Sequence, residues 1–296
     1  MTTSILPLVL AAALLTPLEP TSPRASQKGD ARTRDVYVSV VNAKGAPVPG
    51  LTAADFVVKE DGVAREVLKA GPATEPMDIA LVVDDSQAST AAIQPLREGL
   101  NAFVDTLKGK GEISLVTIGE RPTSLVNYTR DTAAVKKEIN RLFARPGSGA
   151  YLTEGILDVS KGLEKRKAAR PVIVVITFAG VEFSNQQYRP VLDQLLASGA
   201  TLHVLEVGIP PASNNDELRN RNLVIAEGTE QTGGRRDQLL ADTAIPDRMR
   251  QLADELATQY LVTYARPETL IPPEKISVGV ITPGLTARAR TRAAGK

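Results

Sequence analysis

The residues that offer chemistry in this chain lie in two short segments, each directly after a run of apolar residues. Residues 84–89 are Asp-Asp-Ser-Gln-Ala-Ser and follow the run 78–83, and residues 178–182 are Phe-Ala-Gly-Val-Glu and follow the run 171–177. In open α/β sheets, ligands bind beside the carboxyl ends of the strands, and Mg²⁺ prefers oxygen ligands such as carboxylates. The two segments therefore predict a metal or ligand site, with the loop 147–153 close to both.

The residue types that most hydrolases use as nucleophile and base are scarce. The chain has no cysteine and one histidine, which excludes disulfides, cysteine-based zinc sites and thiol nucleophiles. His203 lies in the apolar run 201–207, which is typical of a buried strand, so we expect a core histidine rather than a general base. A hydrolytic triad is therefore not expected, and the protein is predicted not to be an enzyme.

The charge of the chain gives no reason to expect a nucleic-acid partner. Lys and Arg number 35 and Asp and Glu number 34, which leaves a formal net charge of +1. Nucleic-acid-binding proteins usually carry a basic excess that neutralises phosphates. The basic residues within 288–296 are interpreted as a solvated end of the chain.

The first residues have the character of an export signal. Residues 5–15 are apolar and are followed by a segment rich in Pro, Ser and Arg at 17–34. This apolar run has the length of the hydrophobic part of a signal peptide and is shorter than the roughly 20 residues of a membrane span. The segment before it lacks Lys and Arg, and the alternative is a disordered extension. We expect residues 1–30 to be a signal peptide and a disordered segment, and the protein to be exported as a periplasmic, cell-surface or secreted protein. No other segment is long and apolar enough to cross a membrane.

Strand and helix patterns alternate through the middle of the chain. The strands are expected at 78–83, 113–118, 124–127, 171–177 and 201–207, and the helices at 93–107, 132–143, 153–167, 188–197 and 245–256. Strands that are apolar on both faces and alternate with amphipathic helices imply an α/β fold with a doubly wound, mostly parallel sheet. We assign residues 77–266 to this domain.

Shorter β segments flank the α/β pattern at both ends. Residues 31–72 contain short strands and turn signals such as Asp61-Gly62, and residues 267–296 contain a closing hairpin and the basic tail. A β unit as small as the first segment is not stable unless it packs on something. We therefore expect the N- and C-terminal segments to pair into a small accessory β unit beside the α/β domain.

The order of several short segments resembles a known family. They are 45–52 (Gly-Ala-Pro-Val-Pro-Gly-Leu-Thr), 55–56 (Asp-Phe), 60–62 (Glu-Asp-Gly), 81–86 (Leu-Val-Val-Asp-Asp-Ser), 232–235 (Thr-Gly-Gly-Arg) and 256–264 (Leu-Ala-Thr-Gln-Tyr-Leu-Val-Thr-Tyr). Together they resemble the von Willebrand factor A family, and within it the bacterial von Willebrand factor A-related proteins common in acidobacteria. The resemblance spans about residues 35–292.

The resemblance implies a Mg²⁺ site built from an Asp-x-Ser-x-Ser loop, a Thr on a second loop and an Asp after a later strand. Asp84 and Ser86 match the first two positions, whereas the other three positions fall on Ala88, Ala150 and Phe178. Mg²⁺ requires about six oxygen ligands in octahedral order. We therefore expect a degenerate site, with Asp84 and Ser86 as its remnant, and no metal cofactor.

Four further oxygen donors lie near this remnant in the pattern, on Asp85, Ser89, Thr153 and Glu182. We interpret Asp85 and Glu182 as solvated surface carboxylates. We expect Phe178 to pack over the remnant site, which would suit that face to apolar contact. The predicted ligand face consists of Asp84, Asp85, Ser86, Ser89, Thr153, Phe178 and Glu182.

Three alternatives compete with a metal-independent binding domain. The pair Asp84-Asp85 is also similar to the acidic pair of a phospho-acceptor receiver domain, but no later apolar run ends in the Asp that a receiver requires. Metal-dependent adhesion through a non-standard Mg²⁺ site would need a one-residue shift that brings Ser89 into the ligand set. A hydrolase would need nucleophile and base residues that this chain lacks. The polar segment 210–221 is a second candidate surface, which we interpret as an exposed, variable loop that leads into a helix.

The sequence thus predicts an exported, non-catalytic protein-binding or scaffold protein. Its partner is expected to be a protein, and its binding is expected to be independent of metal.

Overall fold

The computed structural model describes Met1 and residues 33–209, 215–266 and 273–292. Most of the predicted signal segment, residues 2–30, and part of the polar segment, residues 210–214, lie outside the described residues. Within the described part of the chain, no helix is both long enough and apolar enough to span a membrane.

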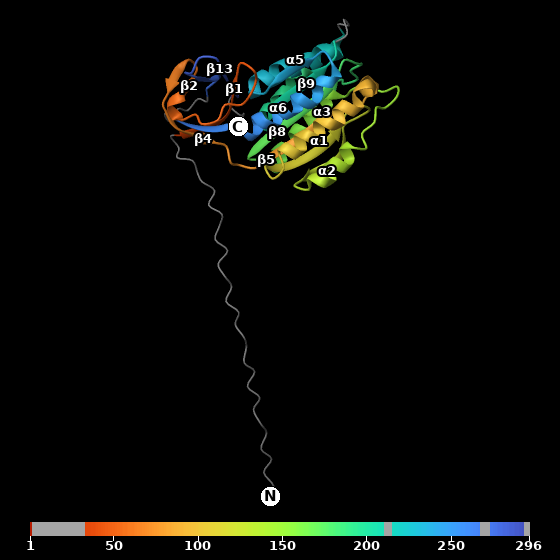
Figure 1. The fold of residues 1–296 in the computed structure, drawn as a ribbon, viewed down its shortest axis with the longest axis horizontal. Coiled ribbons are helices and arrows are strands. Elements are labelled where there is room, and N and C mark those ends of the chain that lie inside the picture. The colour runs from red at the N-terminus through yellow and green to blue at the C-terminus, as the bar shows by residue number, and fades with distance from the viewer. Residues whose placement is uncertain (2–32, 210–214, 267–272, 293–296) are drawn as a thin grey trace.

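A six-stranded sheet forms the centre of the larger part of the molecule (Figure 1). Its order is β10-β9-β8-β5-β6-β7, and the strands are β5 (Met77–Val83), β6 (Gly111–Thr117), β7 (Thr123–Thr129), β8 (Arg170–Phe178), β9 (Thr201–Val207) and β10 (Arg236–Leu239). All neighbouring strands are parallel except β7, which is antiparallel to β6. The predicted doubly wound, mostly parallel sheet is confirmed.

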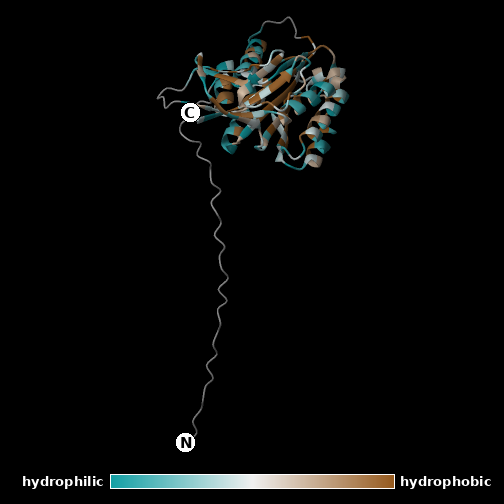
Figure 2. Cartoon of the chain, turned by 60° about the vertical axis from the view of Figure 1, so that its left-hand side comes forward, coloured by the Kyte–Doolittle hydropathy of each residue, from teal (hydrophilic) through white to brown (hydrophobic). Residues whose placement is uncertain are grey.

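Helices cover both faces of this sheet. On one face pack α1 (Ile93–Thr106), α2 (Thr132–Ile139) and α6 (Ile245–Ala257), and on the other pack α3 (Leu152–Arg166), α4 (Tyr188–Ala197) and α5 (Asp216–Thr232). Three short 3-10 helices, η1 (Ala53–Asp55), η2 (Gln87–Ala92) and η3 (Asp242–Ala244), complete the helical elements of the described residues. The strands of the central sheet are hydrophobic, and the helices around them carry hydrophilic residues (Figure 2).

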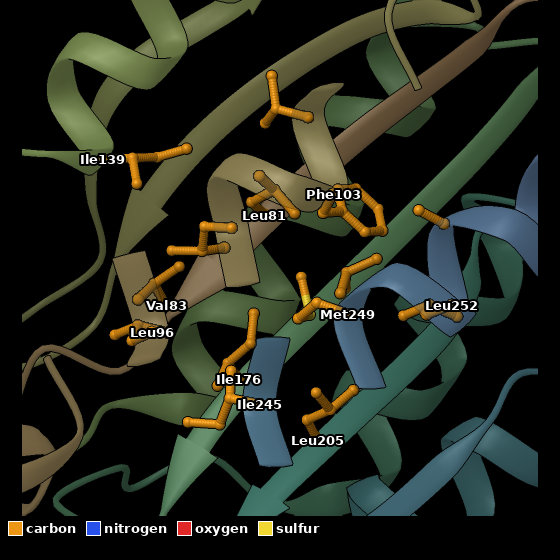
Figure 3. Close-up of a cluster of buried hydrophobic side chains, with 14 of the residues drawn as sticks. Leu81, Val83, Leu96, Phe103, Ile139, Ile176, Leu205, Ile245, Met249 and Leu252 are labelled. Atoms are coloured by element: carbon orange, nitrogen blue, oxygen red, sulfur yellow. The ribbon is translucent and has the colours of Figure 1, made fainter. Parts of the chain in front are cut away.

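The alternation of side chains along a strand explains why the central strands are apolar at nearly every position. On β5, Leu81 and Val83 point into the cluster under α1 and α6, whereas Val82 joins the cluster under α3, α4 and α5. Figure 3 shows the first cluster, where Leu81 faces Phe103 of α1 and Ile176 of β8 faces the helix α6. Because successive side chains point to opposite faces, a strand covered on both sides needs apolar residues in both registers.

The accessory β unit is built from both ends of the described chain, as predicted. One sheet has the order β13-β1-β11-β4, with β1 (Thr33–Asn42), β4 (Val67–Pro72), β11 (Tyr260–Ala265) and β13 (Leu285–Ala289). The second has the order β12-β2-β3, with β2 (Phe56–Glu60), β3 (Val63–Arg65) and β12 (Ile276–Val280). Figure 1 shows these strands together on one side of the α/β part.

The two small sheets share a core of buried side chains. Val38, Val58 and Val262 are fully buried in it, and the rings of Phe56 and Tyr260 meet edge to face with centroids 5.4 Å apart. The sequence places residues 260–265 in the α/β domain, whereas β11 pairs with β1 and β4 of the accessory unit. The alternation of side chains along a strand does not say which sheet the strand joins.

A buried carboxylate ties the accessory unit to the α/β part. Glu255 of α6 is 1% exposed and accepts from Arg288 of β13 at 2.6 Å and from Arg235, which precedes β10, at 3.4 Å. Opposing charge from Arg288 keeps the pKa of this carboxyl low despite its burial, which alone would raise it. The predicted solvated tail is therefore wrong for Arg288, because its guanidinium lies against a buried partner.

Candidate functional site

Asp84 ends the first central strand and holds the sheet edge together. Its side chain is fully buried. One carboxylate oxygen accepts from the Ser86 N–H at 2.9 Å, and the other accepts from the Phe178 N–H at 3.1 Å and the Thr177 hydroxyl at 3.3 Å. Burial raises the pKa of Asp84, and the bonds from Ser86 and Phe178 act against that rise. The carboxylate thus links the ends of β5 and β8 and is turned away from solvent.

Asp85 is also committed to protein partners. One oxygen accepts from the Gly119 N–H at 2.7 Å, and the other accepts from Nε of Arg145 at 2.7 Å. A Cβ at residue 119 would lie 2.5 Å from that carboxylate, so the loop after β6 requires glycine there. Asp85 is 3% exposed, and its interpretation as a solvated surface carboxylate is wrong. The reason is Arg145, which comes from a distant loop and also pairs with Glu120 at 3.2 Å.

The three hydroxyl groups of the predicted ligand face are buried as well. Ser86 bonds to Asp84, and Ser89 donates to the Ser86 carbonyl at 2.7 Å. Thr153 lies in the first turn of α3, where its N–H donates to the Ser184 hydroxyl at 3.0 Å and its own hydroxyl donates to the Glu154 carboxylate at 3.4 Å. These hydroxyls are brought to the same edge of the sheet as Asp84, but each is occupied by a local contact.

Glu182 caps the helix α3 and pairs with a buried arginine. One of its oxygens accepts from the N–H groups of Leu152 at 3.0 Å and Ser184 at 3.2 Å. The other lies 3.5 Å from Nε of Arg221. Glu182 is 3% exposed, so its interpretation as a solvated carboxylate is wrong. Burial raises its pKa from the ordinary value of 4.5 to about 7, against the effect of these partners.

Arg221 and Glu206 belong to this cluster, although neither was predicted. Nη2 of Arg221 donates to the Thr177 hydroxyl at 3.3 Å and lies 4.0 Å from Glu206, which also pairs with Arg236 at 2.5 Å. The polar segment that contains Arg221 was interpreted as an exposed loop, whereas Arg221 lies in α5 and is 4% exposed. Glu206 did carry a signal, because a lone charge in an apolar strand needs a buried partner.

Ala150 and Phe178 contribute no side-chain oxygen to this edge. Ala150 is buried and forms an isolated bridge with Glu182. Phe178 is 5% exposed and belongs to the core cluster under α1 and α6, with the partly buried Ala88 packed against the same cluster. The aromatic ring therefore extends the core up to the end of β8.

Several large apolar side chains are exposed in the loops of the α/β part. Four of them follow the carboxyl ends of β8, β9 and β10, and a fifth, Phe143, lies in the loop between α2 and α3. They are Phe143 (59% exposed), Val181 (59%), Phe183 (48%), Ile209 (77%) and Leu240 (79%). We call these five residues the apolar face.

A shallow groove of about 240 Å³ lies beside the apolar face. Glu120, Pro146, Tyr151 and Phe183 are among its lining residues. The rings of Tyr151 and Phe183 are 5.9 Å apart and tilted. A Cβ at Gly149 would lie 2.8 Å from the Phe183 ring, so glycine allows the ring to lie against the loop.

One family model matches the central part of the chain. Residues 79–179 match the family model of the von Willebrand factor type A domain. The match begins in β5 and ends just after β8, so it includes both strand ends that carry the buried charges. Among curated proteins, none matches the chain in sequence.

A solved structure supports this fold. The chain is similar to a von Willebrand factor type A protein from Catenulispora acidiphila, with 11% identity and a TM-score of 0.53, over 91% of this chain and 74% of that one. It is also similar to proximal thread matrix protein 1 from the mussel byssus, with 14% identity and a TM-score of 0.49, over 63% of this chain and 49% of that one. At these identities the likeness concerns the fold alone.

The oxygen-bearing side chains at this sheet edge bond to other groups of the protein. Both oxygens of Asp84 already accept protein hydrogen bonds, and Ala150 and Phe178 supply no side-chain oxygen. Burial raises the pKa of both Asp84 and Glu182, and the guanidinium of Arg221, 3.5 Å from Glu182, opposes that rise. Across the described residues, no three His, Asp or Glu side chains are placed to hold a metal ion together.

The one histidine of the chain is a core residue, as expected. His203 of β9 is fully buried, and its Nδ1 accepts from the Arg235 N–H at 3.2 Å. Burial lowers its pKa from 6.5 to about 4.

Domains of the von Willebrand factor type A kind generally serve adhesion or interaction rather than catalysis.

Proposed function

We propose that this chain is an exported, non-catalytic protein-binding or scaffold protein that holds its partner through the apolar face, without a metal ion. The match to the von Willebrand factor type A domain supports an interaction role. The apolar face is the single observation that carries the choice of surface, because large apolar side chains exposed near one another on a protein mark sites of association.

The chemistry of this face suits a protein partner with apolar side chains of its own. Phe183 and Leu240 project from the loops after β8 and β10, so a partner that covers both would bury apolar area at the centre of the contact. Arg145 lies 5.6 Å from the ring of Phe143, and Glu120 lines the nearby groove. Aromatic and arginine side chains of this kind commonly supply most of the binding energy of an interface.

Metal-independent binding is supported by the state of the buried charges. A metal-bridged contact would need Asp84 to turn toward solvent, which would break its bonds to the N–H groups of Ser86 and Phe178. The guanidinium of Arg221 already supplies a positive charge beside Glu182 and Glu206.

Calorimetric titration of Mg²⁺ and Mn²⁺ into the full chain tests whether the protein binds a metal ion. We expect no binding heat, and we expect binding in a variant that carries Ala88→Ser, Ala150→Thr and Phe178→Asp. Micromolar binding by the unchanged protein would overturn metal independence and support adhesion through a non-standard Mg²⁺ site. Because Phe178 is a core residue, circular dichroism must show that the restored variant is folded.

Binding-partner enrichment from the cell envelope tests the surface. A variant with Phe183→Ser and Leu240→Ser should lose a partner that the unchanged chain retains in EDTA, with affinity at least about tenfold weaker, since each buried apolar side chain contributes roughly 1.5–3 kcal/mol. The matched control is Val63→Ser, which changes a side chain that is 56% exposed on the accessory unit. A partner lost by the control and kept by the face variant would refute the proposed surface.

Export has its own test. Fractionation of cells that express the full chain should place it outside the cytoplasm, and removal of residues 2–30 should leave it inside. A cytoplasmic location of the full chain would contradict export without touching the binding face.

A further inference from the structure

A cavity of about 190 Å³ lies where the accessory unit meets the α/β part. It is lined by the first residues of β8 and β9, by the ends of α4 and α5, and by β1, so it lies at the sheet edge opposite to the apolar face. Its volume is several times the roughly 30 Å³ that a water molecule occupies in the liquid. The cavity is large enough for a small ligand.

Arg290, which directly follows β13, is among the residues that line this cavity. Its Nε and Nη2 atoms are buried and have no hydrogen-bond partner. Within the described residues no carboxylate lies within ion-pair distance of it, and burial lowers its pKa. A buried charge without a partner is costly and needs an explanation.

A second buried guanidinium lines the same cavity. Arg170 is 5% exposed, and its Nη2 donates to the Leu256 carbonyl at 2.7 Å and to the Gln259 side chain at 2.6 Å. Its Nε has no partner, and its guanidinium lies over the Tyr37 ring at 5.3 Å. Two arginines that line the cavity therefore carry three buried guanidinium nitrogens without a hydrogen-bond partner among the described residues.

The carboxylates nearest to the cavity do not neutralise these groups. Asp35 is among the lining residues, but it is exposed and accepts from the Thr263 hydroxyl at 2.5 Å. Glu75 influences Arg170 and bonds to Tyr37, yet it forms no ion pair with either arginine. Among the charged residues that line the cavity, the two arginines outnumber the one aspartate.

We propose that this cavity binds a small oxyanion through Nε and Nη2 of Arg290 and Nε of Arg170. The Nε and Nη2 atoms of one guanidinium present two parallel N–H donors, which match two oxygens of a phosphate, sulfate or carboxylate group. A bound oxyanion links the end of β13 in the accessory unit to the start of β8 in the central sheet. This site is separate from the apolar face and does not depend on the proposed partner.

The test is calorimetric titration of inorganic phosphate, sulfate and acetate into the full chain at constant ionic strength. At least one of the three should bind at one site, and Arg290→Met should weaken it at least about tenfold, because a charge-assisted pair is lost. Binding of phosphate or sulfate but not acetate would show that the cavity takes a tetrahedral anion. Binding of acetate alone would show that it takes a carboxylate group. Arg250→Met is the matched control, since Arg250 is exposed and pairs with Asp247.

A second measurement separates anion binding from a purely structural role. In anion-free buffer, Arg290→Met should unfold at an unchanged or higher urea concentration, because it removes an unpaired buried charge and keeps the apolar stem. Arg290→Lys keeps the positive charge but lacks the two parallel N–H donors of a guanidinium. This variant should bind the anion more weakly than the unchanged chain. Absence of binding by all three anions, or a lysine variant that binds as tightly as the unchanged chain, would overturn the proposal.

Discussion

Glu182 and His203 should make opposite contributions to the pH dependence of stability, and one substitution should separate them. Burial raises the pKa of Glu182 from 4.5 to about 7 and lowers the pKa of His203 from 6.5 to about 4. Between pH 4.5 and 6.5 the folded protein therefore holds a proton on Glu182 and none on His203. The unfolded chain does the reverse.

The signs of the two contributions follow from this. The stability from Glu182 is complete below pH 4.5 and is lost as the pH rises through about 7. The stability from His203 is complete above pH 6.5 and is lost as the pH falls through about 4. Each contribution changes by about 1.4 kcal/mol per pH unit, so the two slopes cancel in the window where they overlap.

Replacement of Glu182 by Gln should expose the histidine contribution. Gln keeps an acceptor for the N–H groups of Leu152 and Ser184 but does not titrate. Relative to the unchanged protein, the unfolding free energy of Glu182→Gln should fall by about 1.4 kcal/mol for each pH unit of acidification below 6.5. Loss of the ion pair with Arg221 lowers the unfolding free energy by the same amount at every pH. Asp84 is present in both proteins, so its titration does not affect the difference between them.

Urea unfolding followed by circular dichroism at pH 4.5, 5.5 and 6.5 measures this difference. The reasoning is refuted if the two proteins show the same pH dependence, since Glu182 would then be ionised in the folded state. The histidine half has an independent check by NMR, because His203 is the one histidine of the chain. Its ring resonances should not titrate above about pH 5 in the folded protein, given its pKa of about 4.

Two further substitutions test the contacts that hold the fold. Glu255→Gln should lower the unfolding free energy by about 3 kcal/mol in urea titrations, because Arg235 and Arg288 would lose their buried anion. Asp131→Ala should lower it by about 1 kcal/mol, because the Asp131 carboxylate accepts from the N–H groups of Ala133 and Ala134 at the start of α2. An Asp131→Asn control should retain most of that stability, and equal losses in both variants would contradict the capping role.

The central fold could be predicted from the sequence because its strands are buried on both faces. The residues of β8 are all buried, and such a run leaves few alternatives to a sheet covered by helices. The strand β10 was missed because three of its four residues are polar, Arg236, Asp237 and Gln238. This strand lies at the edge of the sheet. Among the described residues its outer side has no neighbouring strand, so its exposed residues do not need to be apolar.

The candidate site could be located but its burial could not. Asp84, Asp85 and Glu182 do lie at the predicted strand ends, since strand position is a local property. Their exposure depends on partners that are distant in sequence, such as Arg145, which is 60 positions from Asp85. Arg221 comes from still another element, α5. Sequence patterns show where a carboxylate lies along a strand, but not which distant guanidinium reaches it.

The accessory unit has a consequence for the order in which the chain folds. Ser39 of β1 bonds to Gln259, 220 positions later, and β1 pairs with β11 and β13. During synthesis, β1 is therefore made early, whereas its partner strands are made only after the whole α/β domain. Until then the edges of β1 are unpaired, and unpaired strand edges can pair with other chains. The strands of the central sheet can therefore pair before the accessory unit can, and the two parts complete their cores at different stages of synthesis.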